Sequence, residues 1–284
     1  MIDIVPELLE KIERDFAVLM EQSSTIQAIL ESIKAGTATY REANIFASEV
    51  GAALSLALRR HITIDSLPDG RMYFNIAERV LGETLGNSHN IVSKVAIEVQ
   101  DIVNRSAGVG IKPVGQMLNK DRIRGLVDKI SNEADFEKVS WLLGEPVVNF
   151  NQAVVDESIK SNAEFHYSSG LSAKIVRTPE SGACKWCREV AGTYAYPDVP
   201  EDVYRRHDRC RCIVNFESSK GKTAIHKGTE GKRKYVQDKY GNYEKTREER
   251  IKYAKELEET AKERAAAARQ KRIDTWKQKK LRGS

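Results

Sequence analysis

Apolar side chains recur every three or four positions up to about residue 165, a spacing that places them on one face of an α-helix. The first helix is predicted over 5–34, with a gap in the pattern at Ser23–Ser24. Thr39 and Glu42 form a capping-box pattern for a second helix, which is rich in alanine and leucine and is expected to be buried. This second helix runs to about Arg60. Further helices are predicted at 72–85, 88–105, 119–131 and 135–143, with Gly86-Asn87 as the break between the first two of them. A last helix is predicted from Pro146 to about residue 164.

The pattern changes after Ser168-Ser169-Gly170. Three short runs of β-branched and aromatic residues, at 174–177, 192–196 and 212–216, are separated by turn residues and predict β-strands. The chain is therefore expected to have an α+β fold. It would consist of a mostly helical body over 1–166, followed by a small Cys-rich, β-containing module over 167–216 that holds all four cysteines.

Beyond the module the chain loses its apolar pattern. Residues 217–243 are rich in Lys, Gly and Tyr, which predicts a linker with a hairpin around Tyr240–Tyr243. Residues 244–284 consist mainly of Glu, Lys, Arg and Ala, a composition that favours one long, basic, solvated helix. The apolar positions of this helix are too sparse to predict a coiled coil.

Composition narrows the class of protein. With 40% hydrophobic residues and four cysteines in 284, the chain has too many apolar residues for a fully disordered protein and too few cysteines for a disulfide scaffold. No apolar stretch reaches the roughly 18 residues that a membrane span needs, so no membrane partner is expected. The N-terminus carries no secretory signal, so the thiols are expected to stay reduced in a cytoplasm.

The net charge of +5 is unevenly distributed. Residues 217–284 hold 21 Lys and Arg against 11 Asp and Glu, so this tail carries +10 and the remainder of the chain −5. Lysine and arginine at this density neutralise phosphates by counterion release, although a solubilising surface helix is the alternative. The candidate nucleic-acid-binding residues are Lys232, Arg233, Lys234, Lys271, Arg272, Lys277, Lys279 and Lys280.

The cysteines fall into two motifs, Cys184-x-x-Cys187 and His207-x-x-Cys210-x-Cys212. Two residues between thiols let both sulfurs face one ion, and zinc takes four Cys or His ligands in a tetrahedron. On a strand, Cys210 and Cys212 would lie nearly two residue rises apart, which is wide for one tetrahedral site and makes a set of three cysteines with His207 plausible. A structural zinc ion is therefore expected, with two disulfides or buried thiols as the alternatives.

A catalytic role for this cluster has little support in the sequence. His207 lies three residues from Cys210, but no third group that would orient a Cys/His nucleophile is readable, and no phosphate-binding loop is present. The chain is therefore expected not to be an enzyme and to have no small-molecule substrate. The other four histidines, His61, His89, His166 and His226, are expected at surface or capping positions.

The motifs of the module stand in a specific order. Cys184-Lys-Trp-Cys187 is followed by Val190-Ala-Gly192-Thr-Tyr194 and then by His207-Asp-Arg-Cys210-Arg-Cys212-Ile-Val. This order resembles the C-terminal module of the minor head proteins of tailed bacteriophages, the Mu F-like head morphogenesis family. The resemblance covers roughly 172–216, and it departs from the family at 197–206 and at Asp208-Arg209, where the family often has Pro-Asn.

The resemblance implies a virion component present in few copies, which is found in the host cytoplasm during assembly. Such a protein would associate with the portal protein and with capsid or scaffold proteins, and it would contact viral DNA during packaging or ejection. The alternative is a cellular zinc-ribbon protein that binds nucleic acid, whose binding would survive loss of the helical body.

Overall fold

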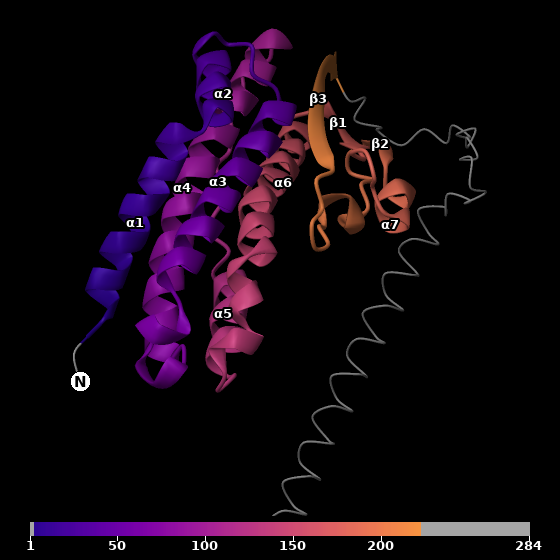
Figure 1. Cartoon of the computed structure of the whole chain (residues 1–284). Helices are drawn as coiled ribbons and strands as arrows, with labels where there is room; N and C mark the ends of the chain where they lie inside the picture. Colours follow the sequence, from indigo (N-terminus) through magenta and orange to yellow (C-terminus); the bar gives the residue numbers. More distant parts are fainter. Residues whose placement is uncertain (1–2, 223–284) are drawn as a thin grey trace, which may run out of the picture. The chain divides into compact units, whose positions relative to one another are not determined.

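In the computed structural model, which describes residues 3–222, a small antiparallel sheet lies on one side of a bundle of long helices (Figure 1), so the predicted α+β class is confirmed. The helices are α1 (Val5–Gln22), α2 (Ser24–Lys34), α3 (Tyr40–His61), α4 (Phe74–Ser106), α5 (Lys120–Ser131), α6 (Glu145–Ser168) and the short α7 (Lys185–Glu189). Turns of 3₁₀-helix lie at Ile64–Ser66, Pro68–Gly70, Phe136–Lys138, Ser140–Leu143 and Glu201–Tyr204. The predicted tail over 244–284 and all the candidate nucleic-acid-binding residues lie outside the described residues.

Side-chain caps set the starts of two helices. The Ser23 hydroxyl accepts a hydrogen bond from the Ile26 amide at 3.3 Å and begins α2, so the helix predicted over 5–34 is two helices. The predicted capping box is confirmed, because the Thr39 amide donates to Glu42 Oε2 at 2.9 Å at the start of α3. The helix predicted over 135–143 is instead a pair of 3₁₀ turns.

The predicted break at Gly86-Asn87 is wrong, because α4 runs through it as one helix of 33 residues. Leu85 and Val92, on either side of the break, are both fully buried against the core. Glycine inside a helix costs about 1 kcal/mol, whereas burial of one Leu or Val side chain contributes about 1.5–3 kcal/mol. Tertiary burial therefore outweighs the local preference of Gly86.

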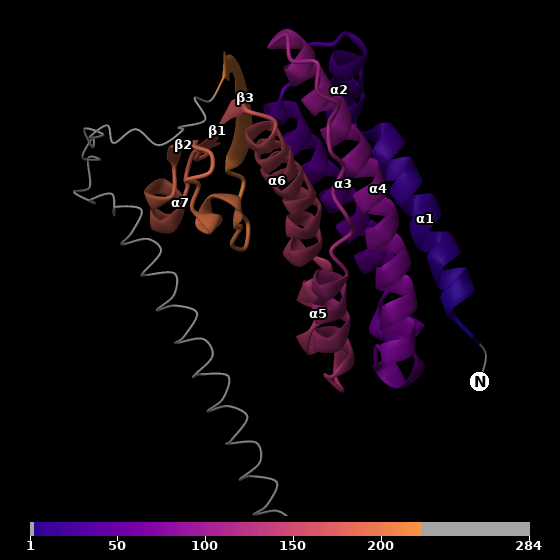
Figure 2. The same ribbon diagram turned by 180° about the vertical axis from the view of Figure 1, so that it is seen from behind.

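The sheet has the strand order β2-β1-β3, with both pairs antiparallel. Its strands are β1 (Leu171–Thr178), β2 (Gly192–Ala195) and β3 (Ile213–Lys222). The three predicted strands are thus present, but β3 extends to Lys222, so the first residues of the predicted linker belong to a strand. In the view from behind, α6 lies between the sheet and the rest of the bundle (Figure 2).

One hydrophobic core joins the sheet to the bundle. Ile175 of β1 and Phe216 of β3 belong to the same buried cluster as the bundle residues, and the Phe216 ring meets the Tyr40 ring edge-on with centroids 6.4 Å apart. The boundary predicted between 166 and 167 therefore does not coincide with a break in packing, and the described residues fall in one compact unit. Among the described residues, no helix is both long and apolar enough to cross a lipid bilayer.

A glycine allows a close helix contact in the bundle core. A Cβ built on Gly51 of α3 would lie 2.7 Å from the Val148 Cα of α6. Real Cβ atoms do not approach backbone atoms this closely, so only glycine lets α3 and α6 pack at this distance. Since α6 also carries the sheet, this contact positions the Cys-rich module on the bundle.

Candidate metal centre

Local backbone structure brings the two cysteine motifs together. Cys184 is the N-cap of α7, and its sulfur accepts a hydrogen bond from the Cys187 amide at 3.4 Å, so the single turn of helix aims both sulfurs to one side. His207 and Cys210 lie in the loop before β3, where Arg209 adopts a left-handed φ of 56° and the Cys210 amide donates to the His207 carbonyl at 3.2 Å. Cys212 directly precedes β3.

All five predicted ligands converge. The His207 Nε2 atom lies 3.3 Å from Cys184 Sγ and 2.8 Å from Cys187 Sγ, and Cys187 Sγ lies 3.8 Å from Cys210 Sγ. The ligand atoms form two triads that share Cys187, the first with Cys184 and His207 and the second with Cys210 and Cys212. In a tetrahedral zinc site with Zn–S bonds of about 2.3 Å, neighbouring sulfurs lie about 3.8 Å apart, so the cluster could hold a metal ion.

The His207 ring is oriented so that a metal could bind its Nε2 atom. Its Nδ1 atom lies 2.6 Å from the Asp208 carbonyl oxygen, so Nδ1–H donates there and the Nε2 atom faces the sulfurs. The Trp186 ring packs edge-on against the imidazole, with centroids 5.7 Å apart. Thiolate sulfurs and an imidazole nitrogen are the donors that zinc prefers.

The disulfide alternative is not the arrangement in this structure. All four cysteines are free, and the 3.8 Å between the Cys187 and Cys210 sulfurs far exceeds the roughly 2.05 Å of a disulfide bond. A hydrogen bond from the Cys212 thiol, with the charges of Arg206 and Arg177, lowers the pKa of Cys210 to about 4. The same hydrogen bond raises the pKa of Cys212, and burial raises that of Cys187.

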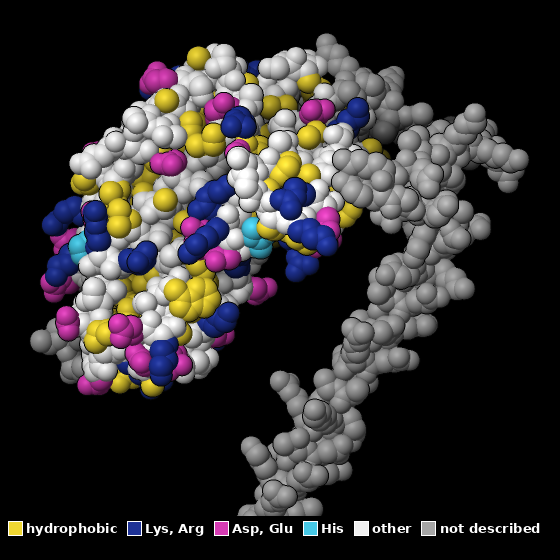
Figure 3. All heavy atoms as spheres, turned by 45° about the vertical axis from the view of Figure 1, so that its right-hand side comes forward, with side chains coloured by type: hydrophobic (Ala, Val, Ile, Leu, Met, Phe, Trp, Pro, Cys, Tyr) yellow, Lys and Arg dark blue, Asp and Glu magenta, His cyan; other side chains and the backbone are white. Residues whose placement is uncertain are grey.

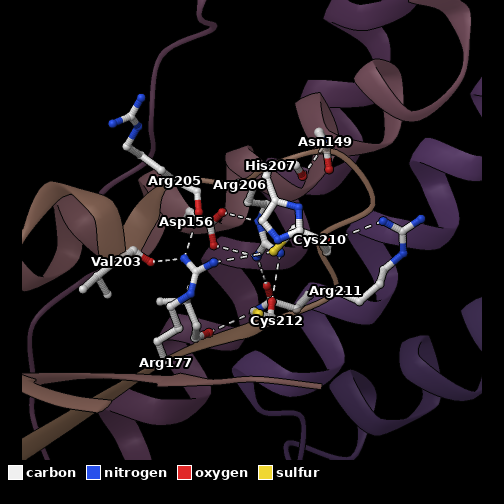
Figure 4. A network of polar contacts seen from close by, with 12 residues as sticks. Asn149, Asp156, Arg177, Val203, Arg205, Arg206, His207, Cys210, Arg211 and Cys212 are labelled. Carbon is white, nitrogen blue, oxygen red and sulfur yellow. Dashed lines mark hydrogen bonds and ion pairs between the residues drawn. The ribbon is translucent and has the colours of Figure 1, made fainter. Parts of the chain in front are cut away.

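Figure 4 shows a buried ionic network around the cysteine loop that the sequence-based predictions missed. Both side chains of the Arg206–Asp156 pair are 1% exposed, and their two contacts, Nε–Oδ2 and Nη2–Oδ1, measure 2.5 and 2.8 Å. Arg206 also donates to the Cys212 carbonyl oxygen at 2.9 Å and to Asn44 Oδ1 of α3 at 2.6 Å. Asn149 of α6 donates to the His207 carbonyl oxygen at 3.2 Å. The cysteine loop is therefore tied to two helices of the bundle.

Part of this network has a signal in the sequence. Asp156 lies three and seven positions before Ile159 and Ala163, both fully buried, so the helical period places a carboxylate on the apolar face of α6. Arg206 has no such signal, because its side chain is buried by residues far away in the chain.

The prediction for two of the histidines is wrong. His166 is fully buried and His89 is 5% exposed. Burial lowers the pKa of both rings, so both are neutral core side chains. His166 Nδ1 lies 3.3 Å from the Ser218 hydroxyl, and its ring packs edge-on against Phe216 at 4.9 Å. His61 is partly exposed beside Asp15.

Comparisons with protein-family models, with curated proteins and with solved structures found no match.

Proposed function

We propose that this chain is a structural minor head protein of a tailed bacteriophage, which joins the portal vertex in the host cytoplasm and remains in the virion. The observation that carries the proposal is the convergence of the five motif residues, Cys184, Cys187, His207, Cys210 and Cys212, on one small centre. The order of these residues resembles that family, and a helical region ahead of the module, as found here, is usual in it.

The number of protein ligands supports a structural role over a catalytic one. Cys187, Cys210 and Cys212 are between 1% and 2% exposed, whereas Cys184 is exposed and His207 is partly exposed. These five candidate ligands are more than the four positions of a tetrahedral site. A catalytic zinc site keeps an open ligand position, whereas a structural site is closed by protein ligands. A bound zinc ion would cross-link α7 to the loop before β3. Such a cross-link stabilises a module of about fifty residues, which is too small to rely on its own core.

The docking of the module favours a head protein over a cellular zinc ribbon. Ile175, Val214 and Phe216 of the sheet are between 0% and 2% exposed and belong to the core of the bundle. A zinc ribbon that binds nucleic acid after loss of the helical body would need a core of its own. Removal of the bundle would instead expose these three side chains to water.

The proposed contact with viral DNA rests on the basic tail. On the face drawn in Figure 3, positive and negative side chains are interspersed over the described residues. The tail, in contrast, carries a net charge of +10. We therefore assign contact with packaged DNA or with an acidic scaffold protein to the tail, and contact with the portal and capsid proteins to the helical body.

Analysis of purified particles tests this proposal. Heads of the phage or prophage that encodes the chain are purified on a density gradient, and quantitative mass spectrometry measures the copies of the chain per portal. We expect the chain in DNA-filled heads at a small fraction of the copies of the major capsid protein, with an abundant host cytoplasmic protein as the control for contamination.

A second experiment deletes the gene. We expect the deletion to lower the yield of DNA-filled heads, and we expect the wild-type gene supplied in trans to restore that yield. If the chain is absent from DNA-filled heads and its deletion leaves their yield unchanged, the proposal is wrong. Salt-dependent binding of the full chain to cellular nucleic acid, together with that absence, would favour the zinc-ribbon alternative.

A further inference from the structure

A second arginine is buried beside the cysteine cluster without an acidic partner. Arg177 of β1 is 2% exposed. Its Nη1 atom donates to the carbonyl oxygens of Val203 at 2.6 Å and Arg205 at 2.8 Å, and its Nη2 atom lies 3.5 Å from Cys210 Sγ. The guanidinium also lies over the Trp186 ring, 5.3 Å from its centroid. No ion pair of Arg177 with a carboxylate is found in the described part of the chain.

The buried carboxylates around the cluster balance only one of the two buried arginines. Asp156 is the only buried acidic residue in the described part of the chain, and it pairs through two contacts with Arg206. Arg122 faces Asp156 as well, but it is partly exposed and is also influenced by the exposed Glu157. Arg177 therefore remains as a buried cation, and proteins rarely bury a charge without a counter-charge.

The charge of the cluster depends on its chemical state. Two disulfides carry no charge and would leave Arg177 unbalanced, whereas without a metal only a Cys210 thiolate could balance its charge. A divalent metal with three thiolates and a neutral imidazole carries −1, which balances one guanidinium, whereas a metal with four thiolates carries −2. The contact from Arg177 to Cys210 Sγ is the kind of hydrogen bond that thiolate ligands of a metal accept.

We propose that Arg177 is the buried counter-cation of a divalent metal centre of net charge −1, with Cys184, Cys187, His207 and Cys210 as ligands. The inference rests on the metal centre of the proposed function, and it adds the ligand set and a positioning residue. Cys184, Cys187 and His207 form one triad, and Cys210 lies at the tetrahedral edge distance from Cys187. Cys212 then remains a neutral thiol beside Cys210.

Metal affinity measured in the full, reduced chain tests the role of Arg177. Zinc content and the zinc dissociation constant, by competition with a chromogenic chelator, are compared for the wild type, Arg177→Met, Arg177→Lys and Lys174→Met. Lys174 is an exposed residue of the same strand, so Lys174→Met removes an equal charge where water screens it. Thermal unfolding of each protein is recorded with excess chelator and with excess zinc.

We expect Arg177→Met to weaken zinc binding by about 10–100-fold, the usual effect of losing a group that supports metal ligands. Arg177→Lys, which keeps the charge, recovers part of that loss, and Lys174→Met binds zinc as the wild type does. The rise in Tm from chelator to zinc should be smaller for Arg177→Met than for the wild type, because the guanidinium stabilises the metal-bound form more than the metal-free form. A merely structural role would lower the stability of both forms.

Cobalt substitution tests the ligand set. The intensity of the sulfur-to-cobalt charge-transfer absorption rises with the number of bound thiolates, so Cys212→Ser should keep it and Cys210→Ser should lower it. The role of Arg177 is overturned if Arg177→Met binds zinc within twofold of the wild-type affinity. If this variant is insoluble, a comparison of Arg177→Lys with Arg177→Gln decides the same point. A loss of metal in Cys212→Ser overturns the ligand set. A reduced wild-type chain that binds no zinc and no cobalt overturns the metal centre itself but leaves the particle test of the head protein untouched.

Discussion

Asp156→Asn should be among the most damaging conservative substitutions in this protein. The carboxylate and the Arg206 guanidinium are each 1% exposed and share two contacts of 2.5 and 2.8 Å. Burial alone would lower the pKa of Arg206, but the Asp156 carboxylate reverses this effect and raises it, so Arg206 stays charged. The asparagine has nearly the shape of the aspartate but leaves that charge uncompensated. Breaking a buried pair in this way costs about 3–5 kcal/mol.

This cost is large against a total stability of about 5–15 kcal/mol. For a folded region of this size it corresponds to a fall in Tm of about 6–20 °C. Urea unfolding followed by circular dichroism, on the full reduced chain with excess chelator, measures the free energy of unfolding. Glu145→Gln is the matched control, because it breaks an exposed pair between the same helix α6 and Arg211 of the same loop, worth about 0–1 kcal/mol.

A double variant separates charge from packing. Asp156→Leu with Arg206→Met removes both charges and keeps the volume, so it should be more stable than Asp156→Asn. The recovery should be partial, because Asn44 Oδ1 and the Cys212 carbonyl oxygen lose their donor. If Asp156→Asn costs less than about 1 kcal/mol, or if the double variant is the less stable of the two, the buried charge does not govern this network.

Three further predictions concern the core, the metal and pH. Gly51→Ala should lower the free energy of unfolding in urea by about 1–3 kcal/mol, because its Cβ would lie 2.7 Å from the Val148 Cα. Gly82→Ala in α4 is the control: its Cβ would meet no atom within 4 Å, so it should raise the free energy of unfolding by up to about 1 kcal/mol. Equal effects of the two variants would contradict the close contact. Zinc at 100 times its dissociation constant should stabilise the reduced chain by about 2.7 kcal/mol, which is measured as a rise in Tm that chelator reverses. A Tm that is independent of zinc would contradict the metal centre. Since burial lowers the pKa of His166, the unfolded state binds more protons than the folded state below about pH 6.5, so the free energy of unfolding in chelator should fall between pH 7 and 5. His166→Gln should reduce the slope of this free energy against pH by up to about 1.4 kcal/mol per pH unit. An unchanged slope would show that His166 is not the group responsible.

The sequence by itself determined the features that depend on near neighbours. The period of apolar residues located the helices of the bundle, Thr39 and Glu42 marked the start of α3, and runs of β-branched residues located the three strands. The spacing of the cysteines and His207 was enough to predict that they form one cluster. All of these depend on residues within a few positions of one another, or on a motif whose chemistry is known in advance.

The tertiary structure alone decided which polar residues are buried and what balances them. Helix α4 continues through Gly86 because both of its halves are covered by other helices. Arg206 meets Asp156 across fifty positions of sequence, and Arg177 meets Cys210 across 33. Whether such a charge is screened by water or balanced by a buried partner depends on which distant parts of the chain cover it. The local sequence around the charged residue does not contain that information.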